Sequence, residues 1–258
     1  MPPRTDQAPR TGPEPALPTG DAKTARVRSM FDAIAPRYDL VNRLMTFGLD
    51  QSWRRATVDA LGLPAGAGVL DLACGTGDLS ALARRRGYRT LGADLSWGML
   101  SANRDAGGSG PDSPGAHPLL QCEASRLPLT TGSVDGIVCG YALRNFTDLA
   151  GSLAEAGRVL RPGGRIAVLE VAAPPPGLLR LGYRIWFEHA VPLLGGLLSD
   201  ADAYRYLPRS TAYLPDPPAL QELFRQAGFA TVNRRLLSGG LSQLITGTRI
   251  GLPPATPT

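Results

Sequence analysis

Short apolar runs alternate with amphipathic helical patterns through most of the chain. Seven segments have the length and hydrophobic content of strands, at residues 69–72, 90–94, 119–122, 133–140, 165–171, 231–237 and 243–249. Helical spacing follows several of them, and after the first strand Leu79, Leu82 and Ala83 share one helical face. Strands that alternate with helices form largely parallel sheets. The pattern therefore predicts an α/β, Rossmann-like fold, with a mostly parallel seven-stranded sheet and helices on both faces.

Two further helical regions lie outside this repeating unit. Residues 24–62 precede the first strand and predict three helices, which we interpret as an N-terminal helical cap. Residues 176–214 are strongly apolar, and Arg180, Arg184 and Glu188 follow one another at intervals of four. Such spacing places the charged side chains on one face of a helix. This segment predicts a helical lid insertion.

The two ends of the chain differ in composition from its centre. Residues 1–23 contain six prolines and few large apolar side chains, and residues 251–258 contain three prolines. Such segments bury too little apolar surface to offset the entropy that ordering costs, so both are predicted to be disordered tails. The chain has 258 residues and 43% hydrophobic content, and residues 24–250 are predicted to form a single domain.

The glycine turn after the first strand predicts a nucleotide site. Gly75 and Gly77 lie between that strand and a helix that begins near Asp78, and Asp94 ends the next strand, 17 residues after Gly77. A carboxylate near this offset binds the ribose hydroxyls of a nucleotide. A dinucleotide motif also needs a third glycine, which is absent here, and Asp78 would repel a pyrophosphate at the helix N-terminus. S-adenosylmethionine has no phosphate, and its ammonium group suits a nearby carboxylate.

The same region resembles a known motif. The run Asp71-x-x-x-Gly75-x-Gly77 resembles the first motif of the class I methyltransferases, and Asp94 falls at the position of their ribose-binding acid. In that fold the residue after the third strand faces the adenine ring. Glu123 is therefore a candidate partner for the adenine amine.

The segment after the fourth strand is the candidate acceptor side. Arg144 and Asn145 follow this strand, and in a parallel sheet ligands bind outside the carboxyl ends of the strands. If the methyl acceptor is a phenolic ring, its carbon becomes nucleophilic when a ring hydroxyl loses its proton. Arg144 would stabilise the resulting phenolate or orient a water that takes the proton. Asp78 would hold the ammonium group of the donor or take part in a proton relay.

Longer segments resemble the ubiquinone/menaquinone biosynthesis C-methyltransferases. The matching segments are Met30–Asp39, Asp71–Asp78, Ala142–Asp148 and Asp200–Leu207, and the likeness extends over residues 24–250. The resemblance implies a class I enzyme that uses S-adenosylmethionine to methylate a ring carbon of a polyprenylated quinol. Demethylmenaquinol to menaquinol is the expected reaction. A paralogous methyltransferase acting on another prenylated or phenolic small molecule is the alternative, because the chain departs from the family pattern after the fifth strand and near its end.

The resemblance and the motifs together give a set of candidate site residues. The candidates for donor binding are Asp71, Gly75, Thr76, Gly77, Asp94, Glu123 and Ala124. The candidates for substrate binding are Tyr38, Tyr141 and Asn145, and those for catalysis are Arg144 and Asp78.

Charge and cysteine content limit the kinds of partner and metal site that the chain is expected to have. The net charge is +5, but the 26 arginines and one lysine are scattered apart from a run at 84–86, so no nucleic-acid partner is predicted. The three cysteines lack metal-binding spacing, so no metal site is predicted. The expected partner is a lipophilic quinol, and the oligomeric state stays open, with a homodimer as one option. We expect a cytoplasmic protein, with peripheral contact of the apolar lid with the inner face of the cell membrane as a further hypothesis.

Overall fold

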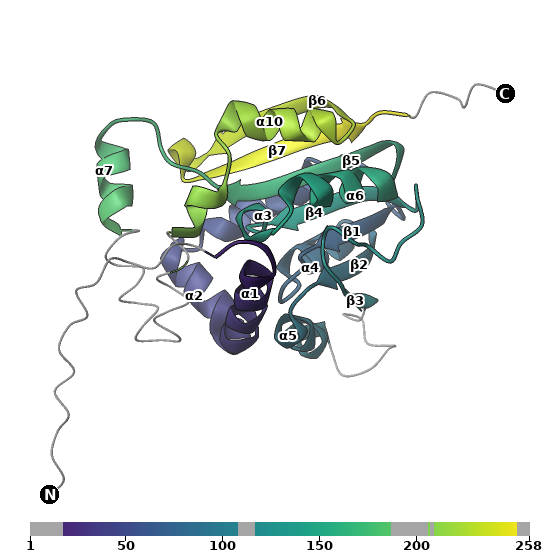
Figure 1. Cartoon of the computed structure of the whole chain (residues 1–258), viewed down its shortest axis with the longest axis horizontal. Helices are drawn as coiled ribbons and strands as arrows, with labels where there is room; N and C mark the ends of the chain where they lie inside the picture. Colours follow the sequence, from purple (N-terminus) through teal and green to yellow (C-terminus); the bar gives the residue numbers. More distant parts are fainter. Residues whose placement is uncertain (1–17, 108–116, 187–205, 207–208, 252–258) are drawn as a thin grey trace, which may run out of the picture.

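A seven-stranded sheet forms the centre of the molecule (Figure 1). The structure is a computed structural model that describes residues 18–107, 117–186, 206 and 209–251. Its strands are β1 (Gly68–Leu72), β2 (Arg89–Asp94), β3 (Leu119–Gln121), β4 (Val134–Gly140), β5 (Leu160–Val171), β6 (Phe229–Leu237) and β7 (Ser242–Arg249). The order is β3-β2-β1-β4-β5-β7-β6, with β1 to β5 parallel and β7 antiparallel to both of its neighbours. The predicted mostly parallel seven-stranded sheet is confirmed.

Helices cover both faces of the sheet, as the sequence predicts. They are α3 (Leu49–Asp59), α4 (Asp78–Arg85), α6 (Leu149–Val159) and α10 (Pro217–Gln226). Because side chains alternate along a strand, Val69 of β1 packs with α3 and α4, whereas its neighbour Leu70 packs in the cluster that holds α6 and α10. A central parallel strand is therefore apolar at successive positions, and this run of apolar residues is the pattern that predicted β1.

A helical region precedes the sheet. It consists of α1 (Gly20–Ile34), η1 (Ala35–Arg37) and α2 (Tyr38–Met45), which lead into α3. The disordered tail predicted for residues 1–23 is wrong for residues 20–23, because α1 begins at Gly20. Lys23 explains the difference: its Nζ donates a hydrogen bond of 2.7 Å to the Phe146 carbonyl and lies 3.7 Å from the centroid of the Tyr213 ring. Residues 1–17 lie outside the described residues.

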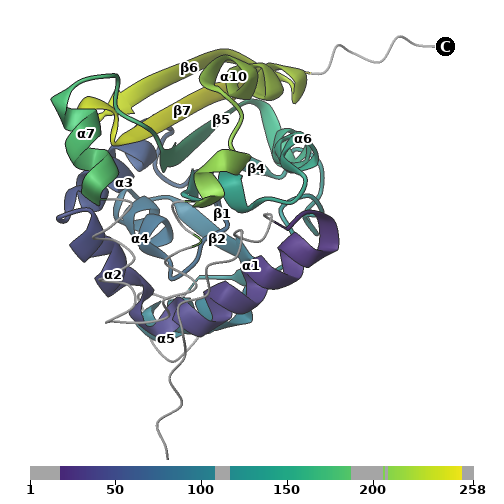
Figure 2. The same ribbon diagram turned by 60° about the vertical axis from the view of Figure 1, so that its left-hand side comes forward.

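One helix, α5 (Trp97–Gly107), was not recognised from the hydrophobic pattern. It follows β2 and lies beside α1 (Figure 2). Gly98 permits this close approach, since a Cβ at that position would lie 2.9 Å from the Cα of Asp32. The Asp32 carboxylate accepts hydrogen bonds from the Gly98 amide, at 2.8 Å, and from the Ser96 hydroxyl, at 2.6 Å. Asp32 thus joins α1 to the first turn of α5.

A short helix, α7 (Leu178–Ile185), begins the segment that was predicted to form a lid. Just after it, the indole Nε1 of Trp186 donates to the Met45 carbonyl at 3.0 Å, and the Trp186 ring packs on Phe47 with centroids 4.6 Å apart. The lid segment therefore contacts the corner between α2 and α3. Most of the rest of the predicted lid, residues 187–205 and 207–208, lies outside the described residues. In the described part of the chain, no helix combines the length and hydropathy needed to cross a membrane.

Candidate functional site

The glycine turn and the acid of β2 are joined by hydrogen bonds. Gly75 and Gly77 both have positive φ angles, of 53° and 93°, so the turn between β1 and α4 suits glycine at both positions. The Gly75 amide donates to Asp94 Oδ2 at 2.8 Å, and the Ser96 amide donates to Asp94 Oδ1 at 2.8 Å. Both carboxylate oxygens of Asp94 are thereby fixed in position beside the turn.

A first cavity, of about 190 Å³, lies over this turn at the carboxyl ends of the strands. Seven of the candidate residues line it: Tyr38, Gly75, Asp94, Glu123, Ala124, Tyr141 and Asn145. Residues of α1, including Asp21, Thr24 and Phe31, also line this cavity, and they were not recognised from the sequence. We refer to this space as the donor cavity.

Asp71 lies beneath the glycine turn and is not among the residues that line the donor cavity. Its side chain is fully buried, and its Oδ2 accepts a hydrogen bond of 2.7 Å from the Ser80 hydroxyl of α4. Among the described residues, no donor reaches its Oδ1. Burial raises the pKa of Asp71 to about 7, despite the opposing hydrogen bond from Ser80. The hydrogen bond between Asp71 and Ser80 therefore joins β1 to α4 beneath the glycine turn.

Replacing Asp71 with asparagine is expected to change how stability depends on pH. The carboxyl of Asp71 is protonated more readily in the folded protein, so the wild type should lose stability as pH rises from about 4 to about 7. Asparagine keeps an acceptor for Ser80 and does not ionise. Urea unfolding without ligand at pH 4.5 and pH 7.5 measures the free energy of unfolding of both proteins. The stability of the variant relative to that of the wild type should be greater at pH 7.5 than at pH 4.5. Parallel losses in the two proteins would contradict the assignment.

A second, largely apolar cavity of about 410 Å³ adjoins the first. Tyr38 and Tyr141 line both cavities, so the two spaces meet at these tyrosines. The walls of the second include Met45, Phe47 and Trp53 from the helical region, together with side chains of α7 and β7. We refer to it as the acceptor cavity, because an apolar space beside the donor cavity suits a lipophilic ring.

Tyr141 lies at a strained point of the backbone between the cavities. Its φ angle of 60° is unusual for a residue with a side chain. Its amide donates to the Leu169 carbonyl at 2.7 Å, and its hydroxyl lies 3.3 Å from the Ser242 hydroxyl. Burial raises the pKa of Tyr141 and likewise that of Tyr38. Both phenols are therefore neutral at physiological pH, and strain of this kind occurs where surrounding contacts hold a functional residue in place.

Arg144 lines the acceptor cavity, and its charge is already paired. Its guanidinium forms a buried ion pair with Glu170 of β5 and donates to the Tyr141 carbonyl at 2.9 Å and the Ser210 hydroxyl at 3.1 Å. Burial acts to lower the pKa of Arg144, but Glu170, together with smaller contributions from Tyr38 and Tyr206, more than offsets this effect and the pKa is raised. Sequence reasoning did not identify Glu170 as a functional residue, although it ends a strand beside Arg144. Asn145 lies nearby, where its Oδ1 is 3.5 Å from the Tyr206 hydroxyl.

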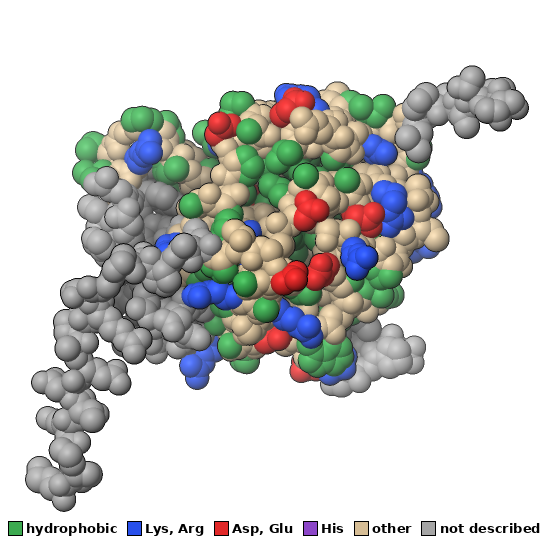
Figure 3. Space-filling model, in the orientation of Figure 1, with side chains coloured by type: hydrophobic (Ala, Val, Ile, Leu, Met, Phe, Trp, Pro, Cys, Tyr) green, Lys and Arg blue, Asp and Glu red, His purple; other side chains and the backbone are tan. Residues whose placement is uncertain are grey.

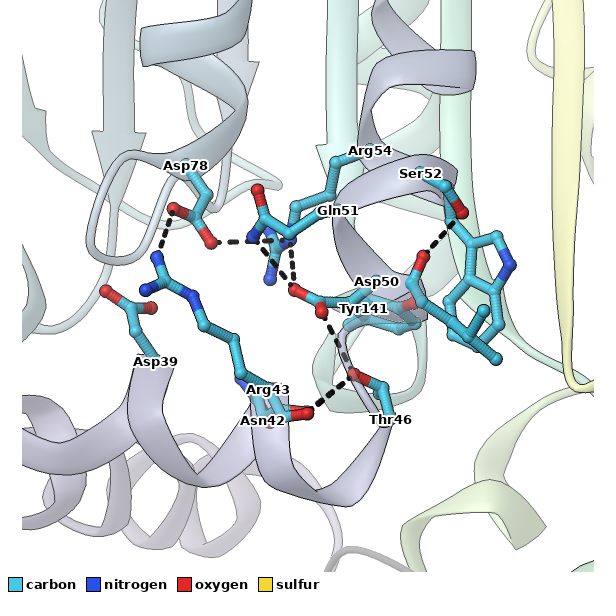
Figure 4. Close-up of polar contacts among 12 residues, drawn as sticks. Asp39, Asn42, Arg43, Thr46, Asp50, Gln51, Ser52, Arg54, Asp78 and Tyr141 are labelled. Atoms are coloured by element: carbon cyan, nitrogen blue, oxygen red, sulfur yellow. Dashed lines mark hydrogen bonds and ion pairs between the residues drawn. The ribbon is translucent and has the colours of Figure 1, made fainter.

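Thr76 and Asp78 face the helical region instead of the donor cavity. The Thr76 hydroxyl donates to Asp39 at 2.7 Å, and the Asp78 carboxylate lies 3.4 Å from Arg54 Nε and 3.8 Å from Arg43 Nη2 (Figure 4). Gly77 likewise does not line the donor cavity. The roles predicted for these residues in donor contact stay predictions, whereas the contacts observed tie α4 to α2 and α3.

These contacts belong to a larger group of charged side chains at the junction of α2, α3 and α4. We refer to Asp39, Arg43, Asp50, Arg54 and Asp78 as the carboxylate–arginine cluster (Figure 4). Arg54 is buried, and its Nε lies 3.4 Å from both Asp50 and Asp78. Its guanidinium carbon also lies 5.7 Å from the centroid of the Tyr141 ring. The sequence contained one signal of this cluster, the four-residue spacing of Asp39 and Arg43 and of Asp50 and Arg54.

Comparisons with known proteins agree with this geometry. Residues 19–249 match the ubiE/COQ5 methyltransferase family. A demethylmenaquinone methyltransferase of Thermus thermophilus is 43% identical over 224 residues, which cover 85% of this chain and 100% of that protein. The ubiquinone/menaquinone biosynthesis C-methyltransferase UbiE of Syntrophotalea carbinolica is 42% identical, with 86% of this chain and 93% of that protein covered.

Solved structures share the fold at low sequence identity. A SAM-dependent methyltransferase from Aquifex aeolicus has a TM-score of 0.56 at 14% identity, covering 88% of this chain and 98% of that chain. Phosphoethanolamine N-methyltransferase 2 of Haemonchus contortus, in complex with S-adenosyl-L-methionine, has a TM-score of 0.56 at 13% identity, covering 77% and 52%. The family match over residues 19–249 and the identity with relatives along almost their whole length show that this chain belongs to the ubiE/COQ5 methyltransferase family.

Proposed function

We propose that this protein transfers the methyl group of S-adenosylmethionine to a ring carbon of demethylmenaquinol, which yields menaquinol. The observation that carries the proposal is the pair of cavities that meet at Tyr38 and Tyr141. One cavity contains the acid and the glycine turn that suit the donor, and the other has the apolar walls that a prenylated ring requires. The Thermus thermophilus relative is named a demethylmenaquinone methyltransferase, which supports this choice of acceptor.

Family membership confirms the expectation of a methyltransferase that uses S-adenosylmethionine. The residues of the donor cavity fit this molecule. Asp94 accepts one amide hydrogen bond at each oxygen, which leaves lone pairs for a ribose diol. Gly75 presents no side chain, and Glu123 and Ala124 line the same space after β3. When bound, S-adenosylmethionine supplies a methyl group that its sulfonium has already activated.

The protein therefore has to position the acceptor and exclude water. Both tasks follow from the acceptor cavity, whose apolar walls hold a ring close to the boundary with the donor cavity. Tyr38 and Tyr141 lie at that boundary as neutral phenols, since burial raises the pKa of each. Aromatic faces attract a cation, so these rings favour a sulfonium beside them without competing for its methyl group.

The test of this function is the lipid quinone content of cells that lack the gene. Mass spectrometry of such cells should show a demethylated menaquinone in place of menaquinone, and the wild-type gene should restore the methylated form. Purified protein should also methylate demethylmenaquinol with S-adenosylmethionine as donor. Unchanged quinones in the deletion strain would contradict the proposal and favour the paralogue that acts on another prenylated or phenolic ring.

We also propose that the protein is cytoplasmic and contacts the inner face of the membrane around the mouth of the acceptor cavity. Phe47 and Leu178, which line that cavity, are 71% and 89% exposed. Figure 3 shows hydrophobic side chains on both sides of the α7 projection, with a basic side chain among them. The exposed Arg180 lies on this helix. An apolar surface with basic residues suits an anionic bilayer, from which a prenylated quinol would enter.

Replacing both Leu44 and Leu181 with aspartate is expected to weaken vesicle binding by at least about tenfold. Each leucine side chain that the bilayer buries contributes about 1.5–3 kcal/mol to binding. Both side chains are exposed, at 44% and 48%, and neither lines the acceptor cavity. Co-sedimentation with phosphatidylglycerol vesicles measures the effect. Leu236→Asp, at a 42% exposed leucine of β6, is the matched control and should bind as the wild type does. Equal binding by all three proteins would exclude this surface.

A further inference from the structure

The acceptor cavity contains a charged group that the proposed function does not yet use. Asp50, at the start of α3, lines this cavity and is the sole carboxylate among the described residues that do so. Its side chain is 1% exposed. A buried carboxylate in a largely apolar space costs free energy unless other groups compensate its charge. We therefore expect the Asp50 carboxylate to have a function in this cavity.

The neighbours of Asp50 hold its carboxylate in a fixed orientation. The Thr46 hydroxyl, which also lies 2.8 Å from the Asn42 carbonyl, donates to Oδ1 at 2.9 Å. The Gln51 amide donates to Oδ2 at 3.1 Å, and Arg54 Nε lies 3.4 Å from Oδ2 (Figure 4). Arg54 is shared with Asp78, at an equal distance. Oδ1 therefore has one hydrogen bond in the structure and keeps lone-pair capacity for a second donor.

The charge of the surrounding cluster favours a proton donor as ligand. The carboxylate–arginine cluster has three carboxylates and two guanidinium groups, which gives it a formal charge of −1. It lies directly behind the boundary between the cavities, because Arg54 faces the Tyr141 ring. Of the described residues outside the cluster, the Tyr141 phenol is close enough to Asp50 for their charges to interact, and its raised pKa keeps it neutral. The cluster thus presents excess negative charge toward the place where a ring and a sulfonium would meet.

Methyl transfer to a ring carbon requires a proton acceptor on the acceptor side. As the ring carbon gives its electrons to the methyl group, positive charge spreads to the ring hydroxyl, which becomes strongly acidic. A carboxylate can then take that proton without the prior formation of a free phenolate. Arg144 cannot serve directly, because a guanidinium has donors and no acceptor, and its partner Glu170 lines neither cavity.

We propose that Asp50 accepts a hydrogen bond, and then the proton, from the ring hydroxyl of the methyl acceptor. The proposal rests on the proposed function. As the carbon–methyl bond forms, the carbon–sulfur bond breaks and leaves its electron pair on sulfur, and the hydroxyl proton passes to Asp50. The ring carbon then loses its own hydrogen as a proton to water, and Asp50 returns its proton to the ring oxygen. Each turnover releases one proton, and S-adenosylhomocysteine and the methylated quinol are formed.

The first test is the turnover of Asp50→Asn with demethylmenaquinol. Asparagine keeps the size and one acceptor of aspartate and does not take a proton, so kcat should fall by about 100-fold or more. The dissociation constant for S-adenosylmethionine should stay within about twofold of the wild-type value, since Asp50 does not line the donor cavity. Asp59→Asn is the matched control on the same helix, where Asp59 is 46% exposed and paired with Arg86, and it should keep wild-type turnover. Turnover of Asp50→Asn within about threefold of the wild type overturns the proposal.

A second variant separates proton transfer from a merely structural role. Thr46→Val removes the hydrogen bond to Oδ1 and keeps the carboxylate. Without that bond the carboxylate is free to turn away from the ring hydroxyl, so kcat/KM for demethylmenaquinol should fall by about tenfold while the dissociation constant for S-adenosylmethionine stays within about twofold of the wild-type value. Wild-type kcat/KM in this variant contradicts the role of Asp50, and this test holds even if Asp50→Asn does not fold.

Ligand binding distinguishes failure of this proposal from failure of the proposed function. The wild type should bind 1-naphthol more tightly than 1-methoxynaphthalene, in calorimetric titrations that involve no methyl transfer. Asp50→Asn should reduce that preference, because a neutral amide oxygen is a weaker acceptor than a carboxylate. If the wild type methylates no demethylmenaquinol but shows this preference, the proposed function fails and the assignment of Asp50 stands. If the wild type methylates demethylmenaquinol and shows no preference for the hydroxyl, the assignment of Asp50 fails alone.

Discussion

Glu170→Ala is expected to destabilise the protein by about 3–5 kcal/mol, the cost of removing one partner from a buried ion pair. Glu170 is fully buried and pairs with Arg144, which is 6% exposed. Its carboxylate also accepts a hydrogen bond of 2.8 Å from the Val171 amide. Without Glu170, the guanidinium of Arg144 would remain buried and uncompensated. Urea unfolding at pH 7.5 measures the change in the free energy of unfolding.

Two further variants make this test specific. Glu222→Ala removes an exposed i,i+3 partner of Arg225, with both side chains 52% exposed, and should change stability by less than about 1 kcal/mol. The double variant Arg144→Met and Glu170→Met removes both charges and should recover most of the loss. If Arg144 acts on the acceptor, the double variant should fold and stay inactive. A Glu170→Ala protein as stable as the wild type would show that water reaches the pair, and full activity in the double variant would exclude Arg144 from catalysis.

The sheet and the glycine turn were predictable because their signals are local in sequence. Successive apolar residues mark a strand that is buried on both faces, as in β1, and the turn needs positive φ angles at Gly75 and Gly77. The position of Asp94 follows from its offset after that turn. Each of these inferences depends on about 30 neighbouring residues or fewer, the span of one βαβ unit.

The carboxylate–arginine cluster was not predictable in the same way. Opposite charges four residues apart are typical of a solvent-facing helix. This spacing occurs in α2, between Asp39 and Arg43, and in α3, between Asp50 and Arg54. The side chain of Arg54 becomes buried only because these helices pack against the N-terminus of α4, where Asp78 meets it. The pairing of Arg144 with Glu170 likewise depends on the neighbouring positions of β4 and β5 in the sheet. Contacts of this kind follow from the tertiary arrangement.

Asp94→Asn is expected to weaken the binding of S-adenosylmethionine by about 30- to 1000-fold, or about 2–4 kcal/mol, since hydrogen bonds to a charged group contribute about 1.5–3 kcal/mol each. In the structure the two oxygens of Asp94 accept from the amides of Gly75 and Ser96. Asparagine replaces one oxygen with an amino group, which would face a second N–H donor. The variant therefore loses the charge that would receive the ribose diol and also loosens the glycine turn.

The pH dependence of donor binding shows whether the charge of Asp94 is the cause. Burial raises the pKa of Asp94, and the amides of Ser96 and Gly75 partly offset this rise, so protonation begins at a higher pH than for a free aspartate. Calorimetric titration should therefore show the wild type losing affinity as pH falls toward the acidic range, while Asp94→Asn stays weak and nearly constant. Asp105→Asn, at a 74% exposed side chain of α5, should follow the wild type. If Asp94→Asn instead binds the donor within about threefold of the wild type at pH 7.5, the carboxylate does not hold the ribose, and the amides of the glycine turn must supply most of the binding energy.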